Sequence, residues 1–597
     1  MPTYKAPIKD MQFVLFDVLG AERLTELKGY EEAGRDTFDA VLEEAAKIAE
    51  EVLFPLNRSG DEEGCSFNNG AVTTPKGFPE AYKTFREGGW TALTGNPNFG
   101  GSGLPHALDF AVGEMMSAAN MSFAMYPGLS HGAYNAIEVW GTEEQKTTYL
   151  PKLVDGTWSG TMCLTEPHCG TDLGLIRTKA VPNTDGSYAI TGTKIFISAG
   201  EHDLTDNIVH LVLAKLPDAP HGTKGISLFV VPKFLPNADG SVGERNALVC
   251  GAIEHKMGIK ASATCVMNFD GAQGWLVGPP NNGMKAMFTM MNAARLFVGL
   301  QGLSLAEASY QNALAYAKDR RQGRALSGAK EPEAAADPII VHPDVRKNLL
   351  TMKSLIEGGR ALIYWTALEL DKSEKLEEAA AKKEADDFVA LLTPILKSYL
   401  TDMAVTLSSI GMQIFGGHGY IREHGMEQYL RDAKITAIYE GANGIQALDL
   451  VGRKLPDGMG RPLRRFFHPA MQFIKDEAGN EALKTLLPAW SKNFTRLQQA
   501  TLLVAERGVA KPEEAGAMSM DYLNAFALVA IGFMWLKMAK VAAEKMDGAD
   551  AEAKKFYDAK LKTADFYMSK ILPQVSGLLL SLQSGGKSLM ALEPDQF

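Results

Sequence analysis

The sequence predicts a multidomain α+β protein in which helical regions precede and follow a central β-rich region. Apolar residues recur every three or four positions before about residue 157 and after about residue 281, a spacing typical of helices. Between these regions, short β-rich runs are separated by Gly, Pro, Asn and Asp, as in a small antiparallel sandwich or barrel. At 597 residues the chain is also too long for one core.

Composition narrows the class of protein further. Hydrophobic residues make up 46% and charged residues 22% of the chain, which is typical of soluble globular proteins. The net charge of -11 and the absence of a basic block argue against nucleic-acid binding. The five cysteines show no CxxC spacing, which indicates reduced thiols. The first residues lack the pattern of a secretory signal, so we expect a cytoplasmic location.

Residues 1–157 are predicted to form an N-terminal helical domain with an arm. The segment 38–53 carries apolar residues at helical spacing, and Gly- and Pro-containing loops at 95–105 and 125–132 separate the helices. Residues 158–280 are predicted to form the central β domain. It includes TMCLTEPHCGTDLG at 161–174, an apolar strand that leads into a turn.

Helical periodicity returns at residues 281–455, which are predicted to form a helical bundle. The Ala-, Glu- and Lys-rich run 371–387 reads as a solvated helix or the tip of a helical hairpin. A break at 456–462 precedes a C-terminal helical domain, 456–597. Its longest apolar run, 525–536, is shorter than the roughly 20 residues of a membrane helix, which predicts a buried helix and no membrane span.

The segment 413–444 combines a glycine cluster with a carboxylate. Gly416, Gly417 and Gly419 allow backbone amides to approach a phosphate closely, because no Cβ stands in the way. Glu440 ends an apolar run and precedes Gly441, where a flexible turn could admit a substrate. From spacing alone, an ordinary turn and a solvated capping carboxylate remain the alternative.

Six motifs occur in order along the chain: LTEPHCGTDLG (164–174), TGTKIFISAG (191–200), EHKMGIKAS (254–262), YAKDRRQGR (316–324), QIFGGHGY (413–420) and RDAKITAIYEG (431–441). Together they resemble the acyl-CoA dehydrogenase family over residues from about 40 to 454. The N-terminal arm and the C-terminal helical region resemble the larger members, among them enzymes that act on 3-(methylthio)propanoyl-CoA.

The resemblance implies a reaction in which a proton leaves Cα of an acyl-CoA and a hydride leaves Cβ. Glu440 matches the catalytic base of the family, which must be desolvated to reach a sufficient pKa. The resemblance also implies which residues bind the substrate. They are Thr171, Asn292, Arg295 and Gly441.

The cofactor that the resemblance implies is FAD, and no metal site is expected. The residues expected at the flavin end are Met162, Leu164, Thr165, Phe196, Ile197 and Ser198. The residues expected at the adenosine diphosphate end are Arg320, Gln322, Gln413, Phe415, Gly416 and Gly417. In the family the two groups at the adenosine diphosphate end come from different subunits, so we expect a homodimer or larger homo-oligomer. Electron-transfer flavoprotein is the implied electron acceptor.

The sequence departs from the family pattern at the adenine end of the cofactor. KDRRQGR lacks the Phe-Gly-Lys of the family, and Ala442 and Gly444 replace a Thr and a Gln that contact the cofactor. Two other activities remain alternatives within the family: dehydrogenation of medium or long acyl chains, and an acyl-CoA oxidase reaction. A DNA-associated flavoprotein of the same fold is a more distant alternative, which the absence of a basic block disfavours.

Overall fold

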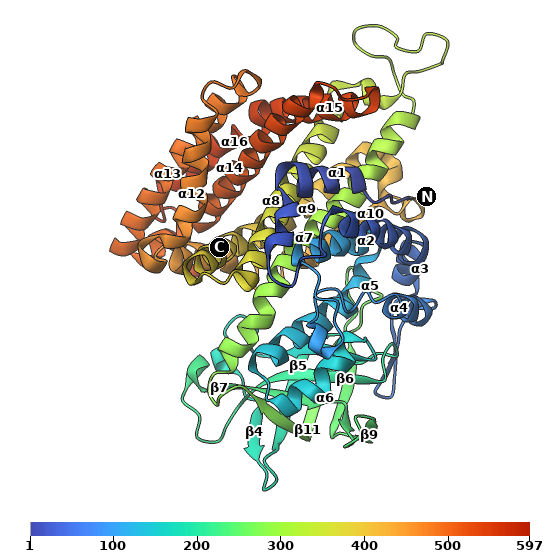
Figure 1. The fold of residues 1–597 in the computed structure, drawn as a ribbon, viewed down its shortest axis with the longest axis vertical. Coiled ribbons are helices and arrows are strands. Elements are labelled where there is room, and N and C mark those ends of the chain that lie inside the picture. The colour runs from blue at the N-terminus through green and yellow to red at the C-terminus, as the bar shows by residue number, and fades with distance from the viewer. Residues whose placement is uncertain (1) are drawn as a thin grey trace. The chain divides into compact units, whose positions relative to one another are not determined.

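The computed structural model describes residues 2–597. It is mostly helical with a β-sheet in the middle of the chain (Figure 1), which confirms the predicted order of helical, β-rich and helical regions. The chain divides into two compact units: unit 1 comprises 1–43, 105–114 and 298–597, and unit 2 comprises 44–104 and 115–297. The division into four domains stays a prediction.

The N-terminal region contains six α-helices and a short hairpin. The helices are α1 (Ile8–Gln12), α2 (Arg35–Lys47), α3 (Pro55–Glu63), α4 (Phe78–Glu87), α5 (His106–Trp140) and α6 (Glu143–Val154). The hairpin β1 (Ser66–Asn68) and β2 (Ala71–Thr73) corrects the expectation of an entirely helical region. Asn69 and Gly70, with φ of 48° and 87°, join its strands, and an Asn-Gly pair favours this two-residue turn.

The sheet of unit 2 is closed. Its strands are β3 (Trp158–Cys163), β4 (Lys179–Pro182), β5 (Tyr188–Ser198), β6 (Asn207–Lys215), β7 (Ile226–Pro232), β10 (Leu248–Ile253) and β11 (Thr264–Val277). The short strands β8 (Phe234–Pro236) and β9 (Val242–Arg245) form a separate pair. Because β7 pairs with both β11 and β6, the strands close into the predicted barrel. However, β3 and β4 pair with β6 in parallel, so the sheet is mixed and not purely antiparallel.

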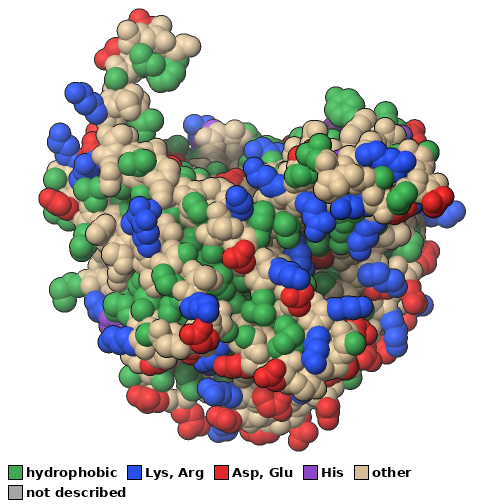
Figure 2. All heavy atoms as spheres, turned by 90° about the horizontal axis from the view of Figure 1, so that it is seen from above, with side chains coloured by type: hydrophobic (Ala, Val, Ile, Leu, Met, Phe, Trp, Pro, Cys, Tyr) green, Lys and Arg blue, Asp and Glu red, His purple; other side chains and the backbone are tan. Residues whose placement is uncertain are grey.

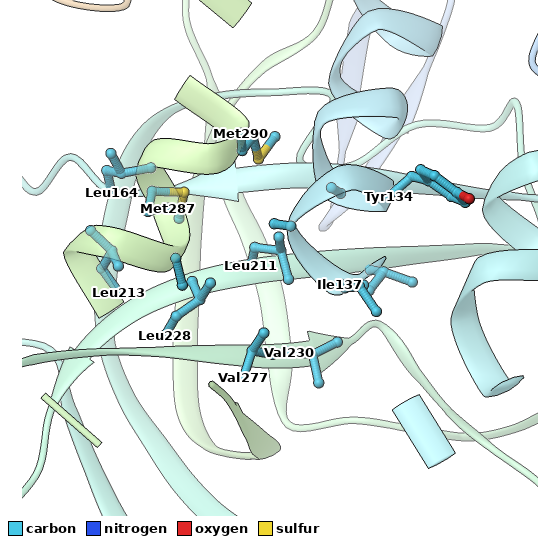
Figure 3. Packing of buried hydrophobic residues seen from close by; sticks show 14 of the residues in the cluster. Tyr134, Ile137, Leu164, Leu211, Leu213, Leu228, Val230, Val277, Met287 and Met290 are labelled. Atoms are coloured by element: carbon cyan, nitrogen blue, oxygen red, sulfur yellow. The ribbon is translucent and has the colours of Figure 1, made fainter. Parts of the chain in front are cut away.

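The main core of unit 2 lies between this sheet and its helices. Leu211, Leu228 and Val230 from the strands face Ile137 of α5 and Met287 of α7 (Gly283–Asp319) (Figure 3). These side chains are buried, and burial of such apolar area is the main free-energy term that favours folding.

Close packing of α5 against β3 depends on a glycine. A Cβ on Gly160 would come 2.4 Å from the Cβ of Ala133, well inside van der Waals contact. A side chain at Gly160 would therefore separate α5 from the strand that leads into TMCLTEP.

Unit 1 contains the long helices of the bundle and the C-terminal helices. They are α8 (Pro343–Lys375), α9 (Ala379–Phe415), α10 (Met426–Thr436), α11 (Asn443–Asp449), α12 (Arg461–Asp476), α13 (Leu486–Ala510), α14 (Pro512–Met546), α15 (Ala551–Phe566) and α16 (Gln574–Ser584). The loop between α7 and α8 extends away from these two helices (Figure 1). The C-terminal segment α12–α16 is helical, as predicted.

The run 371–387 forms the predicted tip of a helical hairpin, between α8 and α9, but it is only partly solvated. Asp371 is buried and accepts a hydrogen bond from Tyr30 Oη at 3.0 Å, and Asp387 pairs with Arg461 Nε at 2.5 Å. Two of the acidic residues in this run are therefore buried and bonded within the protein, and are not part of a solvated surface.

Two segments are long and apolar enough to cross a membrane, Ala379–Tyr420 and Pro512–Met546. Within the apolar windows of these segments, 72% and 83% of the residues are buried inside the protein. Both are therefore core helices of unit 1, which confirms the interpretation of 525–536 as part of a buried helix.

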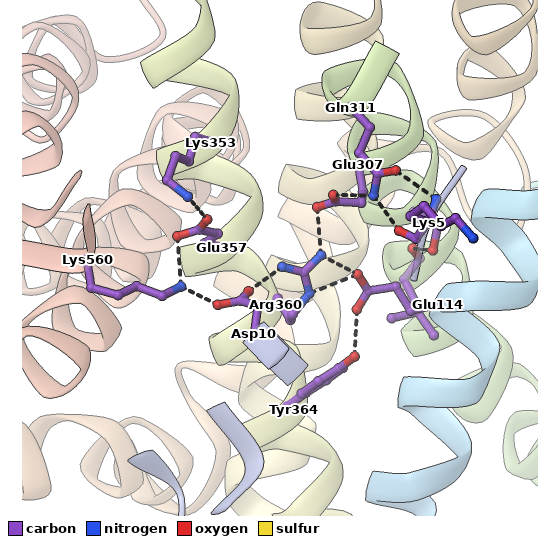
Figure 4. Close-up of polar contacts among 12 residues, drawn as sticks. Lys5, Asp10, Glu114, Glu307, Gln311, Lys353, Glu357, Arg360, Tyr364 and Lys560 are labelled. Carbon is purple, nitrogen blue, oxygen red and sulfur yellow. Dashed lines mark hydrogen bonds and ion pairs between the residues drawn. The ribbon is translucent and has the colours of Figure 1, made fainter. Parts of the chain in front are cut away.

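A network of buried charged groups connects the N-terminal arm with the bundle and the C-terminal helices (Figure 4). Arg360 of α8 donates to Glu114 at 2.6 Å, to Glu307 at 2.7 Å and to Asp10 at 2.5 Å. Lys560 of α15 donates to the other carboxylate oxygen of Asp10. Four helices and the arm therefore share one set of ion pairs.

Burial by itself raises the pKa of the Asp10 carboxyl, but Lys560 and Arg360 lower it to about 2, below its ordinary value of 3.8. The stabilisation from a carboxylate whose pKa is lower in the folded state is fully present above its unfolded pKa. It is lost as the pH falls through the folded value. For Asp10 this window extends from about pH 4 down to about pH 2.

We predict that Asp10→Asn lowers the free energy of unfolding by about 3 kcal/mol at pH 7, because two buried cations lose their shared carboxylate. Urea unfolding followed by the helical circular dichroism signal measures this difference. The matched control is Asp558→Asn, which removes an exposed ion pair with Lys562 and is expected to have little effect. The difference between wild type and Asp10→Asn should shrink below about pH 4. A constant difference down to pH 2 would contradict the role of the charge.

Candidate functional site

The residues expected at the flavin end lie on two adjacent segments of unit 2. Met162 lies on β3, Leu164 and Thr165 follow it directly, and Phe196, Ile197 and Ser198 end β5. The N–H of Ile195 donates to the carbonyl of Thr165 at 2.9 Å, which joins the two segments. The structure therefore brings this group of predicted residues together.

A β-bulge turns Phe196 outward. Cys265 of β11 pairs with Ile197 of β5, and Met267 pairs with Lys194. Two residues of β5, 195 and 196, therefore lie opposite the single residue 266 of β11. Such a bulge bends the strand and re-aims a side chain. Phe196 takes a left-handed φ of 59° and is 59% exposed, whereas Leu164 and Ile197 are buried in the core. An exposed aromatic ring beside the half-buried Thr165 and Ser198 suits a flat heteroaromatic ligand with polar edges.

A buried ion pair holds the segment after β3. Lys194 of β5 donates to Glu166 Oε1 at 2.9 Å and to the carbonyl of Leu164 at 2.9 Å. Glu166 also accepts hydrogen bonds from Thr178 Oγ1 at 2.6 Å and from the N–H of Arg177 at 2.7 Å. Burial opposes ionisation of Glu166, but Lys194 and these donors lower the pKa of its carboxyl overall. The pair fixes Leu164 and Thr165 relative to β5.

Glu440 lies in unit 1, in the turn between α10 and α11. It is half-buried and has a left-handed φ of 58°, and Gly441 follows with a φ of 88°. The neighbouring Tyr439 donates from its hydroxyl to Gln301 Oε1 at 2.5 Å. Burial, together with the charges of Glu440 and Asp432, raises the pKa of Tyr439 well above its ordinary value, so this phenol keeps its proton.

The residues expected at the adenosine diphosphate end also lie in unit 1. Gln413 and Phe415 end α9, and Gly416 and Gly417 follow with no described atom within 4 Å of an ideal Cβ. Open backbone of this kind allows a ligand to approach closely. Arg320 and Gln322 are exposed just after α7.

The ends of α7 and α9 are adjacent in unit 1. Tyr316 of α7 stacks on Phe415 of α9 with ring centroids 4.1 Å apart, and its hydroxyl hydrogen-bonds with His418 Nδ1 at 2.8 Å. The Tyr316–Phe415 stack therefore places the two predicted groups at neighbouring helix ends.

The remaining predicted substrate residues are distributed over both units. Thr171 is exposed in the loop after β3, and Asn292 is exposed on α7. Arg295, also on α7, is half-buried, with its guanidinium 5.6 Å from the ring centre of Phe288. These three residues lie in unit 2, whereas Gly441 lies in unit 1.

Two buried cations, Lys194 and Lys397, were not predicted to contribute to the site. Each of them occupies a position where the apolar pattern of its strand or helix indicates burial. Lys194 lies an even number of positions from Ile190 on β5, so strand alternation places both on the same face. Lys397 follows the apolar run around Leu396 in α9 and is fully buried. A lysine at a position where apolar residues recur is expected to be buried, and a buried lysine requires a polar partner.

One cluster with metal-binding residue types occurs in unit 2. Ligand atoms of Glu166, His168 and Cys169 lie within 4.8 Å of one another. The Glu166 carboxylate already pairs with Lys194, and burial raises the pKa of the Cys169 thiol, which disfavours the thiolate that a metal requires. We therefore assign this cluster to structure.

Both basic and acidic side chains are present on the face shown in Figure 2. The net charge of the chain is -11, so acidic groups outnumber basic ones overall.

Family models match successive parts of the chain. They describe the acyl-CoA dehydrogenase N-terminal domain over residues 35–157, the middle domain over 161–272 and the C-terminal domain over 281–455. A fourth, described as acetyl-CoA dehydrogenase C-terminal like, matches residues 466–593. The matches therefore extend from the helical N-terminal region into the additional C-terminal helices.

Individual relatives match over nearly the whole chain. The 3-methylmercaptopropionyl-CoA dehydrogenase of Ruegeria pomeroyi is 42% identical over 98% of this chain and 99% of its own. A butyryl-CoA dehydrogenase of Syntrophomonas wolfei is 34% identical over 100% of this chain and 99% of its own. The crystal structure of Caenorhabditis elegans ACDH-11 in complex with C11-CoA covers 95% of this chain and 92% of its own at 20% identity, with a TM-score of 0.77, and shows the same fold.

We predict that Lys194→Met destabilises unit 2 by about 3–5 kcal/mol, because Glu166 stays buried without its cation. The double variant Lys194→Met/Glu166→Gln should recover a large part of this loss, since it removes both charges. Thermal unfolding followed by tryptophan fluorescence measures both effects. Equal losses in the single and the double variant would show that the charge pair is not the cause.

Proposed function

The chain belongs to the acyl-CoA dehydrogenase family, and we propose that it oxidises 3-(methylthio)propanoyl-CoA to 3-(methylthio)acryloyl-CoA. The chain is an oxidoreductase that acts on acyl-CoA thioesters with FAD as cofactor. The observation that carries the substrate proposal is the 42% identity to the Ruegeria enzyme over 98% of this chain. The compound in the name of that enzyme, 3-methylmercaptopropionyl-CoA, is the same thioester. This assignment places the enzyme in dimethylsulfoniopropionate demethylation.

We assign the proton transfer to Glu440. Its carboxylate takes the proton from Cα, and its half-buried position reduces the hydration of the charged form. The N–H of Glu440 donates to the thioester oxygen, on which negative charge develops as the proton leaves. Gly441 provides space beside the reacting carbons, and Tyr439 keeps its proton and stays bound to Gln301. These roles together promote loss of one proton from the substrate.

We assign FAD binding to the two groups of residues expected from the motifs. The outward-facing Phe196 supports the flavin ring, and Thr165 and Ser198 supply polar contacts at its edge. The open backbone at Gly416 and Gly417, with Arg320 and Gln322, suits the diphosphate. FAD, when bound, would supply the acceptor for the hydride that leaves Cβ, so the substrate would lose one proton and one hydride and become the trans-2-enoyl-CoA.

The remaining parts of the proposal follow from the family. Thr171, Asn292 and Arg295 contact the CoA moiety, and electron-transfer flavoprotein receives the electrons. A cytoplasmic homodimer or larger homo-oligomer completes the adenosine diphosphate site. The butyryl-CoA dehydrogenase relative supports a second candidate substrate class, straight short acyl chains.

Glu440→Gln is expected to lower kcat by about 10²–10⁴-fold, because a neutral amide does not accept the α-proton. Bound FAD, measured after release from the protein, should stay at the wild-type level. The matched control is Glu423→Gln, at an exposed carboxylate nearby in the chain, which should keep wild-type kcat. Wild-type turnover by Glu440→Gln would overturn the assignment of the base.

The substrate assignment predicts the order of kcat/KM values across a panel of acyl-CoA thioesters with an artificial electron acceptor. 3-(Methylthio)propanoyl-CoA should rank first and the chain-length-matched pentanoyl-CoA next, with octanoyl- and palmitoyl-CoA slower. Much faster oxidation of palmitoyl-CoA would contradict the proposal. Stoichiometric hydrogen peroxide in air would indicate an acyl-CoA oxidase instead.

A further inference from the structure

The turn that carries Glu440 has an unfavourable backbone conformation. Glu440 and Gly441 are consecutive residues with φ of 58° and 88°. The left-handed region is unfavourable for a residue with a Cβ and persists only where surrounding contacts enforce it. The turn should therefore be held by specific partners, and the structure supplies them from three helices of unit 1.

Gln446 contacts the turn directly. It lies on α11, and its Nε2 donates to the carbonyl of Glu440 at 3.2 Å and to the carbonyl of Gly441 at 3.2 Å. The side chain is 1% exposed, so water does not substitute for these contacts. The amide orientation is determined by its neighbours, because a flipped amide would place Oε1 against two carbonyl oxygens. One side chain therefore fixes two successive peptide planes.

Asn443 attaches the start of α11 to α9. Its Oδ1 accepts from the buried Lys397 Nζ at 2.9 Å, and its Nδ2 donates to Thr401 Oγ1 at 2.9 Å and to the carbonyl of Ser398 at 3.1 Å. The N–H of Asn443 donates to the carbonyl of Ala437 at 3.2 Å, across the turn. These bonds make the position of α11, and with it that of Gln446, depend on α9.

The other side of the turn is attached to α7. Tyr439 precedes Glu440, and its hydroxyl bond to Gln301 holds the chain where it enters the turn. Glu440 is therefore flanked by Tyr439 on one side and by Asn443 and Gln446 on the other. All of these groups belong to unit 1.

We propose that Gln446 is a positioning residue that fixes the peptides following Glu440 and Gly441, and through them the backbone dihedrals of Glu440, with Asn443 and Lys397 anchoring its helix. This inference rests on the proposed function, in which Glu440 takes the α-proton and its N–H binds the thioester oxygen. The N–H of Glu440 belongs to the peptide that follows Tyr439, and the Tyr439–Gln301 bond holds that side of the turn, whereas Gln446 holds the other side. Both tasks therefore depend on the backbone of Glu440 being held from both sides, and a small displacement of a reacting group lowers rates by as much as about 10²-fold. Gln446 itself touches neither the substrate nor the cofactor in this scheme.

The test compares Gln446→Leu with Gln145→Leu. Gln145 is a matched control, because it is also a buried amide that donates to a backbone carbonyl, that of Leu276 at 2.9 Å, but it lies on α6 in unit 2. Anaerobic flavin reduction by saturating 3-(methylthio)propanoyl-CoA or butanoyl-CoA provides the rate. Gln446→Leu should slow it by about 10–100-fold with little change in KM or FAD content. Gln145→Leu should keep the wild-type rate.

Two further readouts separate positioning from general damage. Amide hydrogen exchange should become faster in peptides covering 437–446 in Gln446→Leu and stay unchanged there in Gln145→Leu. Gln446→Glu places a carboxylate against two carbonyl oxygens, and protonation at lower pH restores one donor. Its rate relative to wild type at the same pH should therefore rise between pH 8 and pH 5.5.

The outcomes distinguish this inference from the proposed function. A wild-type reduction rate in Gln446→Leu, or a loss explained entirely by lost FAD or unfolding, would overturn the role of Gln446. A pH-independent defect in Gln446→Glu would overturn it as well. If Glu440→Gln reduces its flavin at the wild-type rate, the proposed function fails, whatever Gln446→Leu does.

Discussion

The buried guanidinium of Arg360 is the constraint on which the architecture of unit 1 depends. A cation this far from water is stable only if several carboxylates surround it, and the chain supplies Glu114 from α5, Glu307 from α7 and Asp10 from the arm. Lys560 shares Asp10, which extends the same requirement to α15. The N-terminal arm and the C-terminal helices are thus integral to the compact unit.

Buried cations play a related part near Phe196 and Glu440, two of the non-glycine residues with a positive φ. Lys194 lies two residues before Phe196 and binds the carbonyl of Leu164, just after β3. Lys397 binds the side chain of Asn443, which lies three residues after Glu440. In each case a non-glycine residue adopts a positive φ close to a charged group that is fully buried and satisfied. Such a group resists displacement, because moving it would leave a polar atom without a partner. The strain is therefore held by contacts that are costly to break.

The order of helical and β-rich regions could be predicted because its signals are local. Helical period and strand alternation each lie within a short window and predict the order of regions. The IYEG motif is equally local and carries the prediction that Glu440 is the base. The ion-pair partners could not be predicted, since Asp10 and Arg360 are 350 positions apart and nothing local pairs them. The β1–β2 hairpin is a different case, because its Asn-Gly signal is local and favours this turn.

Ala442 and Gly444, where the sequence departs from the family pattern, alternate with residues whose polar side chains are bonded within the protein. Positions that contact the cofactor in the family carry no side-chain hydrogen-bonding group here, whereas Asn443 and Gln446 direct theirs into the protein. The hydrogen bonds described for the turn come from α7, α9 and α11, so its geometry is set by the chain's own side chains. The backbone of Ala442 belongs to the same network, because its carbonyl accepts from the N–H groups of Ile445 at 2.7 Å and Gln446 at 3.2 Å. Its methyl side chain adds no hydrogen bond, so the geometry of the turn depends on the side chains of Asn443 and Gln446.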